Sequence, residues 1–187
     1  MGGYIKYHKK HDVSIIKFAD IRKDKQGTKN IFSLEYIEYI DILEEAKLPI
    51  VGIDEGKCKK FNDVLIANEV IVFGYPRSIG IKKIPQIEYD KPLLRKGIVA
   101  GKNNKVKTIV IDCPTYQGYS GGPVIEINKI DIHATVCKVI GLVSQFVPFM
   151  EEWKNVTIGY SNFELSNSGY SIVTPIEVAF ELLNKTK

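Results

Sequence analysis

Short runs of β-branched and aromatic residues recur along most of the chain, and they constrain its fold more than any other feature. The runs are rich in Val, Ile, Tyr and Thr and are separated by Gly, Pro and Asn, as is typical of antiparallel strands joined by turns. The sequence therefore predicts a mainly β fold, either a sandwich or a barrel. The expected strands are residues 13–18, 69–73, 93–100, 106–112, 123–127, 134–145 and 169–173.

Two segments carry helical signals. Residues 174–177 form a capping-box pattern, in which Thr174 caps the helix, Pro175 takes its first position and Glu177 follows three residues after the cap. Apolar residues at helical spacing then predict one face of a C-terminal helix that docks on the barrel: Ile176, Ala179, Phe180 and Leu183. The apolar residues at positions 33–47 fit neither the period of a helix nor that of a strand cleanly. The acidic side chains of this segment suit an exposed helix or an inserted hairpin, and we expect a helix.

Length and composition bound the class of protein. With 187 residues, 44% of them hydrophobic, the chain suits one ordinary soluble domain or two small subdomains. No apolar run approaches the roughly 20 residues that cross a bilayer, and the N-terminus lacks the apolar core of a secretory signal peptide. We therefore expect a cytoplasmic protein. Cys58, Cys113 and Cys137 are odd in number and show no metal-ligand spacing, so we also expect reduced thiols and no metal site.

The charge of the chain is mildly positive. Its net charge is +4, and the first 30 residues carry eight Lys or Arg against three Asp. An acidic partner would suit this bias, but a solvated basic surface explains it more simply. The basic stretch lacks interleaved aromatic residues that would stack on bases, and it holds no nucleic-acid motif. We therefore expect neither nucleic acid nor a membrane as a partner.

A glycine-rich segment, Gly118-Tyr119-Ser120-Gly121-Gly122-Pro123, lies directly before the expected strand at residues 123–127. Glycine lets the backbone turn sharply and brings its N–H groups close to a bound carbonyl. The N–H groups of Gly118 and Ser120 would then point at the oxyanion of a tetrahedral intermediate, where loss of one donor typically costs about 3 kcal/mol. The segment thus suits an oxyanion hole, and the alternative is a plain glycine-rich turn.

The longer string, residues 118–124, resembles the nucleophile loop of the chymotrypsin or trypsin-like serine peptidases. The resemblance covers most of the chain from Asp12 to Leu183 and is weakest between Asp20 and Asn68. It implies a chymotrypsin-like double β-barrel with a C-terminal α-helix. Residues 1–68 would be the remaining part of the first barrel, with an insertion, and residues 69–187 the second barrel. Other segments match the family in the expected order: residues 11–18, 72–76, 139–144 and 169–171.

The same resemblance implies a site. Ser120 would be the nucleophile that forms an acyl-enzyme with a peptide or protein substrate, the amides of Gly118 and Ser120 the oxyanion hole, and Asp12 the residue that orients the base. No metal or organic cofactor is implied. Family members with zymogen activation usually carry an aspartate directly before the serine, whereas this chain has Tyr119. We therefore expect no such switch, and other contacts must hold the loop.

Four further residues are expected to contact the substrate. Thr115 and its neighbour Pro114 stand where a trypsin-type pocket carries a carboxylate, so Lys or Arg specificity is not supported. Phe146 occupies a position that is often small in the family, which predicts a shallow or altered pocket unless a loop shift moves the ring aside. The expected substrate-binding residues are Thr115, Ser144, Phe146 and Tyr170.

The catalytic base is not evident in the sequence. In the family, a histidine precedes the aspartate by several strands, but only 11 residues precede Asp12. His11 is adjacent to Asp12, so on a strand their side chains would point to opposite faces. For His8 and His133, an ordinary surface role is the simpler interpretation.

Loss of the first half of the N-terminal barrel explains this gap, and the open strand edges would then require self-association or a covering partner. The resemblance implies a trypsin-like serine endopeptidase, whose activity in this chain alone depends on a base that the sequence does not show. The alternatives are a catalytically inactive, protease-like binding module and a truncated protease fragment.

Overall fold

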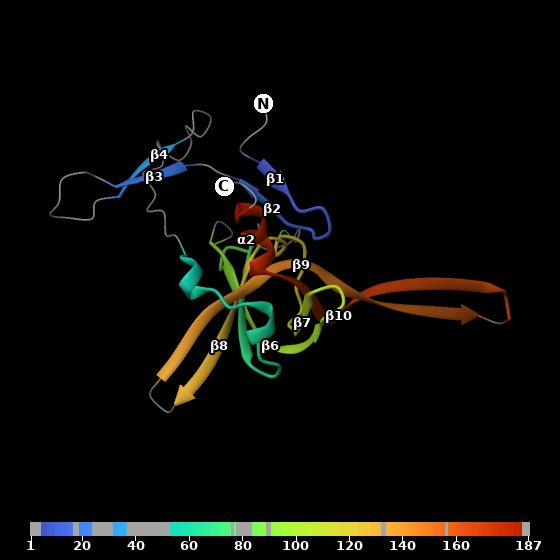
Figure 1. The fold of residues 1–187 in the computed structure, drawn as a ribbon. Coiled ribbons are helices and arrows are strands. Elements are labelled where there is room, and N and C mark those ends of the chain that lie inside the picture. The colour runs from blue at the N-terminus through green and yellow to red at the C-terminus, as the bar shows by residue number, and fades with distance from the viewer. Residues whose placement is uncertain are drawn as a thin grey trace.

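The computed structural model describes residues 5–16, 19–23, 32–36, 53–75, 77, 84–88, 91–131, 134–155 and 157–184. For residues 19–23 and 32–36 it describes the strands but not the side chains. The fold is mainly β, as predicted, with one α-helix among the described elements. A central barrel carries the helix at one end, and two long hairpins project from it (Figure 1). Within the described residues, no helix is long and apolar enough to span a bilayer.

Six antiparallel strands close into the barrel, in the order β10-β7-β6-β5-β8-β9. Residues alternate between the core and the surface along β5 and β7, as the period of a strand requires. The chain does not run round the barrel in sequence order, because β8 pairs with β5 and β10 pairs with β7. The strands are β5 (Glu69–Gly74), β6 (Leu93–Asn103), β7 (Thr108–Asp112), β8 (Pro123–Asp131), β9 (Ala134–Asn155) and β10 (Tyr160–Pro175).

The barrel interior is filled by Val, Ile and aromatic side chains, including Val70, Ile111 and Ile140, all fully buried. Four of the core residues come from outside the six strands: Phe61, Val64, Cys113 and Tyr119. Phe61 opens the short 3-10 helix η2 (Phe61–Asp63), which follows η1 (Glu55–Lys57). Packing therefore continues across the expected boundary between residues 68 and 69.

The C-terminal helix α2 (Ile176–Asn184) is present, but its cap and its buried face differ from the prediction. Thr174 and Pro175 still belong to β10. The Thr174 hydroxyl is hydrogen-bonded to Ser144 Oγ, and the Glu177 carboxylate accepts a hydrogen bond from the Phe61 N–H. The predicted face is shifted because Leu183 is exposed, whereas Val178, Ala179 and Leu182 are buried and pack against Val13.

The N-terminal elements form two separate two-stranded sheets. One pairs β1 (Ile5–Tyr7) with β2 (Ser14–Ile16), and the other pairs β3 (Ala19–Lys23) with β4 (Phe32–Tyr36). The predicted helix over residues 33–47 is therefore wrong at residues 33–36, where backbone pairing with β3 overrides the ambiguous pattern. Residues 37–47 lie outside the described part of the chain. The predicted strand at residues 13–18 appears as β2, and residues 17 and 18 are likewise not described.

The last two strands are much longer than predicted. β9 was expected to end at Gln145 and β10 to begin at Gly169, but β9 continues to Asn155 and β10 starts at Tyr160. Their extra residues pair with each other in a two-stranded ribbon beyond the barrel, shown in orange in Figure 1. We call residues 148–155 of β9 and 160–167 of β10 the arm. Mutual pairing explains the extra length, because each strand satisfies the backbone of the other.

Candidate active site

The glycine-rich segment forms the loop between β7 and β8, and a tyrosine fixes it to the barrel. The Tyr119 side chain is buried in the core, and its ring lies so close to Gly74 that a side chain at Gly74 would clash with it. The Arg95 guanidinium lies over the rings of both Tyr116 and Tyr119, at 4.9 and 5.9 Å from their centroids. Tyr119 thus holds the loop by packing. It occupies the position directly before the serine, where family members with zymogen activation usually carry an aspartate.

Two glycines of the loop adopt conformations that other residues rarely reach. Gly118 has φ +97°, and a Cβ there would lie 1.9 Å from the Tyr75 carbonyl oxygen. Gly121 has φ +81° but faces open space. Left-handed φ values favour glycine because they cost other residues roughly 1–2 kcal/mol. The loop therefore needs glycine at Gly118 for both conformation and close approach, and at Gly121 for conformation alone.

Backbone hydrogen bonds fix the loop on both sides of the serine. The N–H of Tyr75 donates to the Gly118 carbonyl at 2.9 Å, and the N–H of Gly121 donates to Val143 at 2.8 Å. Ser120 itself is exposed, and its hydroxyl donates a long hydrogen bond of 3.4 Å to the Ser144 carbonyl. Among the described residues, neither the Gly118 nor the Ser120 amide donates to a backbone carbonyl. In the described part of the chain, these two backbone donors are therefore free beside an accessible serine hydroxyl.

Thr115 lies in the loop but does not face an open pocket. Its side chain is buried, and its hydroxyl is hydrogen-bonded to Ser171 Oγ at 2.8 Å. Ser171 Oγ in turn donates to the Cys113 carbonyl, and the Asn167 side chain donates to the Thr115 carbonyl. This network leaves the Thr115 hydroxyl no direct contact with a bound substrate. Thr115 instead fixes the strand β10 against the start of the loop.

The other expected substrate residues lie on the two strands that leave the loop region. Ser144 is half-buried beside Ser120, whereas Phe146 and Tyr170 are exposed by 42% and 44%. Phe146 pairs with Ser171, the residue that follows Tyr170. The structure therefore brings Ser144 to Ser120 and places both aromatic rings on the surface nearby. Neither ring lines the cavities of about 630, 670 and 280 Å³ described for this protein.

Asp12, His8 and His11 lie in the hairpin formed by β1 and β2. Asp12 is exposed in the turn between β1 and β2, next to Val13, which packs on α2. His8 and His11 line a hollow together with Lys107, which precedes β7, whereas Ser120 belongs to the loop that follows β7. Among the described residues, Asp12, His8 and His11 form no hydrogen bond or ion pair with Ser120. His133 lies outside the described residues.

The interactions of His8 and His11 are local. His8 Nδ1 accepts hydrogen bonds from the N–H groups of Lys10 and His11, and its Nε2 lies 3.6 Å from the Glu181 carboxylate. Both nitrogens of His8 are therefore engaged. Burial, followed by the neighbouring His8, lowers the pKa of His11 below its ordinary value. These contacts join the first hairpin to α2 and involve no residue of the serine loop.

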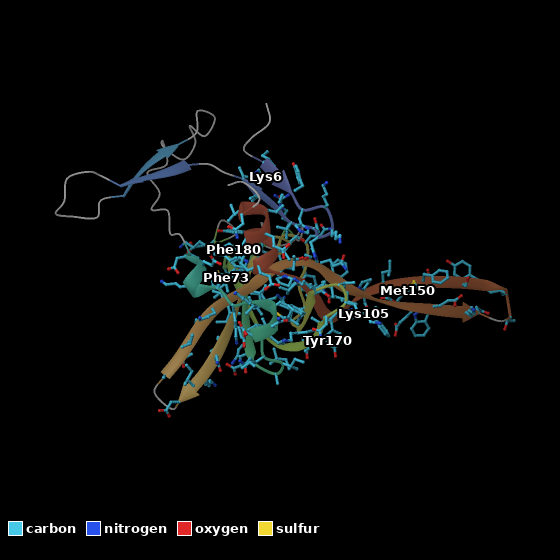
Figure 2. The ribbon with its side chains drawn as sticks, in the orientation of Figure 1. Lys6, Phe73, Lys105, Met150, Tyr170 and Phe180 are labelled. Carbon is cyan, nitrogen blue, oxygen red and sulfur yellow. The ribbon has the colours of Figure 1, made fainter. Side chains whose placement is uncertain are left out.

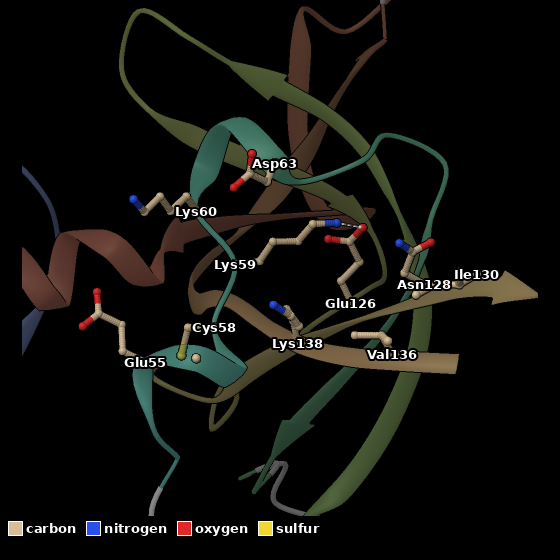
Figure 3. A pocket seen from close by; sticks show the side chains of 11 residues that line it. Glu55, Cys58, Lys59, Lys60, Asp63, Glu126, Asn128, Ile130, Val136 and Lys138 are labelled. Atoms are coloured by element: carbon tan, nitrogen blue, oxygen red, sulfur yellow. Dashed lines mark hydrogen bonds and ion pairs between the residues drawn. The ribbon is translucent and has the colours of Figure 1, made fainter. Parts of the chain in front are cut away.

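A buried carboxylate, Glu126 on β8, was not singled out from the sequence. Its Oε1 accepts hydrogen bonds from Lys59 Nζ at 2.9 Å, from Asn68 Nδ2 at 2.6 Å and from the Leu65 N–H. Its Oε2 is buried and has no partner among the described residues. Figure 3 shows the carboxylate beside Lys59, below the segment that carries Asp63, in a hollow of about 630 Å³. Only alternation along β8 could have indicated that Glu126 points inward.

Neither a protein-family model nor a curated protein matches this sequence. In the part of the chain that the structure describes, no group of three or more His, Cys, Asp or Glu side chains is placed to hold a metal ion.

Proposed function

We propose that this chain carries the nucleophile of a trypsin-like serine endopeptidase, with Ser120 forming an acyl-enzyme. In this reaction the Ser120 oxygen bonds to the scissile carbonyl carbon as a base moves its proton to the departing amine, and water then hydrolyses the ester. The double β-barrel of such enzymes belongs to the same proposal. The closed barrel supports it because chymotrypsin-like enzymes are built on β-barrels.

The geometry of the serine loop carries the proposal. Ser120 is exposed, it lies between glycines at left-handed φ, and the amides of Gly118 and Ser120 are unengaged among the described residues. Preorganised N–H donors beside a nucleophile stabilise the negative charge that develops on the attacked carbonyl. A plain surface turn would not require Tyr119, the residue before Ser120, to be buried in the core.

The proposal also requires a base, and the described residues bring no imidazole to Ser120. A serine hydroxyl without a base is a weak nucleophile. Reaction with a fluorophosphonate probe therefore tests the proposal directly, because the probe labels activated serines. We expect labelling of the wild-type chain that is lost in Ser120→Ala. Absence of labelling in the folded wild type would refute catalysis by this chain.

A second candidate function is a peptide-binding module without catalysis. It is favoured by the Ser120 hydroxyl, which donates to the Ser144 carbonyl and contacts no imidazole among the described residues. Pairing between β8 and β9 ends at Pro123 and Leu142, so the edge of β9 beyond Val143 is open to strand addition by an extended peptide. Peptide binding that survives in Ser120→Ala, without labelling of the wild type, would select this candidate.

A further inference from the structure

The arm is the most exposed part of the described chain. Every residue at positions 148–155 and 160–166 is exposed, including large apolar side chains such as Trp153 at 61% and Leu165 at 69%. Figure 2 shows side chains projecting from both sides of this ribbon, with Met150 labelled. A two-stranded ribbon is marginally stable in water unless a third strand or another element covers it. The arm therefore has the character of a surface that a partner covers.

The strand register assigns the side chains of the arm to two faces. Residues directly opposite each other in an antiparallel pair point to the same face, and neighbours along a strand point to opposite faces. Asn162 pairs with Trp153, Glu164 pairs with Glu151, and the register is continuous from Tyr160 to Asn167. One face, which we call the acidic aromatic face, thus carries Phe149, Glu151, Trp153, Tyr160 and Glu164.

The charges of the acidic aromatic face are not balanced. Glu151 and Glu164 lie directly opposite each other, an arrangement in which like charges destabilise the pair. Among the described residues, neither makes an ion pair, and both are exposed. The reverse face differs, because its Glu152 forms an ion pair with Lys154 at 3.1 Å. One face of the arm therefore presents aromatic rings around two unneutralised carboxylates.

We propose that the acidic aromatic face binds an extended peptide segment that presents Lys or Arg side chains. Cations are attracted both to the carboxylates and to the faces of Trp, Tyr and Phe rings. The backbone of the same segment can add to an open edge of the ribbon. The two carboxylates supply the opposite charge, and the three rings supply the surface, that Lys or Arg side chains on one face of an added strand would contact.

The same observations disfavour other occupants. A second copy that stacked this face on itself in a two-fold dimer would bring four carboxylates together. An anionic lipid surface would repel Glu151 and Glu164. A purely apolar partner would leave both carboxylates desolvated without a cation, which is costly. A basic peptide segment alone satisfies the rings and the charges together.

Trp153, the only tryptophan of the chain, makes this proposal directly measurable. The probe is a synthetic peptide of alternating Lys and Val, and its control is the same peptide with Glu in place of Lys. Titrations follow the fluorescence of Trp153 in the Ser120→Ala variant, so that binding is measured apart from any reaction at Ser120. We expect saturable binding of the Lys peptide that weakens as salt is added, and no binding of the Glu peptide.

Charge-removing variants test which face binds. Glu151→Gln with Glu164→Gln should weaken Lys-peptide binding by about five- to tenfold, as expected for the loss of two exposed ion pairs. The matched control, Glu152→Gln on the reverse face, should bind like the parent. All three positions are exposed, so the variants should keep the far-UV circular dichroism spectrum of the parent. Equal binding of both peptides, equal weakening by both variants, or a dimer strengthened by the double variant would overturn the proposal.

Discussion

Replacing Lys59 by methionine should destabilise the barrel strongly, because it leaves a buried carboxylate without its cation. The Glu126 side chain is 1% exposed, and Lys59 Nζ is its ion-pair partner at 2.9 Å. Removing one member of a buried pair typically costs 3–5 kcal/mol. Asn68 Nδ2 and the Leu65 N–H still donate to Glu126 Oε1. We therefore expect a loss near the lower limit, about 3 kcal/mol.

The comparison with a double variant separates charge from packing. Lys59→Met combined with Glu126→Gln removes both charges while keeping similar volumes, and neutral replacements of buried pairs are often close to isoenergetic. The double variant should therefore recover most of the loss. The stability of Glu126→Gln alone should lie between those of Lys59→Met and the double variant. This variant leaves the charge of Lys59 unpaired, but the Lys59 side chain is 15% exposed and lies close to water.

Urea denaturation followed by far-UV circular dichroism measures these differences. Tryptophan fluorescence would not serve, since Trp153 lies on the arm and does not report the barrel core. With a slope of about 1–3 kcal/mol per molar urea, a loss of 3 kcal/mol lowers the midpoint by about 1–3 M. A loss below about 1 kcal/mol in Lys59→Met would refute the reasoning, because it would mean that water reaches the Glu126 carboxylate.

Two further predictions concern the serine loop and the thiols. Gly118→Ala should lower the free energy of unfolding more than Gly121→Ala, for which we expect a loss of about 1 kcal/mol. Both positions need a left-handed φ, but only Gly118 lies close to other backbone atoms. Equal losses of the two variants in urea denaturation would contradict this. In maleimide labelling followed by mass spectrometry, Cys137 should react first and Cys113 last, since Cys137 is exposed whereas burial raises the pKa of the Cys113 thiol and reduces its thiolate fraction. Rapid labelling of native Cys113 would show that the loop beside it opens.

The β class and the positions of the barrel strands were predictable from local pattern. β5 begins at Glu69 and β6 at Leu93, where the sequence predicted them, because alternation and β propensity are properties of neighbouring residues. Strand lengths were less predictable. β9 and β10 extend each other by mutual pairing, and residues 33–36 form a strand through contact with β3. These outcomes depend on partners that are distant in sequence.

The candidate site divides in the same way. The glycine pattern around Ser120 predicted a sharp turn, and Gly118 and Gly121 have the left-handed φ values that this requires. No local pattern indicated that Thr115 would turn inward to Ser171, or that Lys59 would be the partner of Glu126. The roles of Asp12 and Ser120 in catalysis remain predictions, and no hydrogen bond joins the two residues in the described part of the chain.

The sequence by itself determined which segments become strands and where the backbone must turn, since both follow from side-chain shape and from the freedom of glycine. Only the tertiary structure decided which side chains meet. Closure of the barrel brought Tyr119 into the core and left Ser120 exposed. Pairing of β9 with β10 placed Glu151 opposite Glu164 on a face with three aromatic rings. Such contacts arise from strand register, which is set by the fold as a whole.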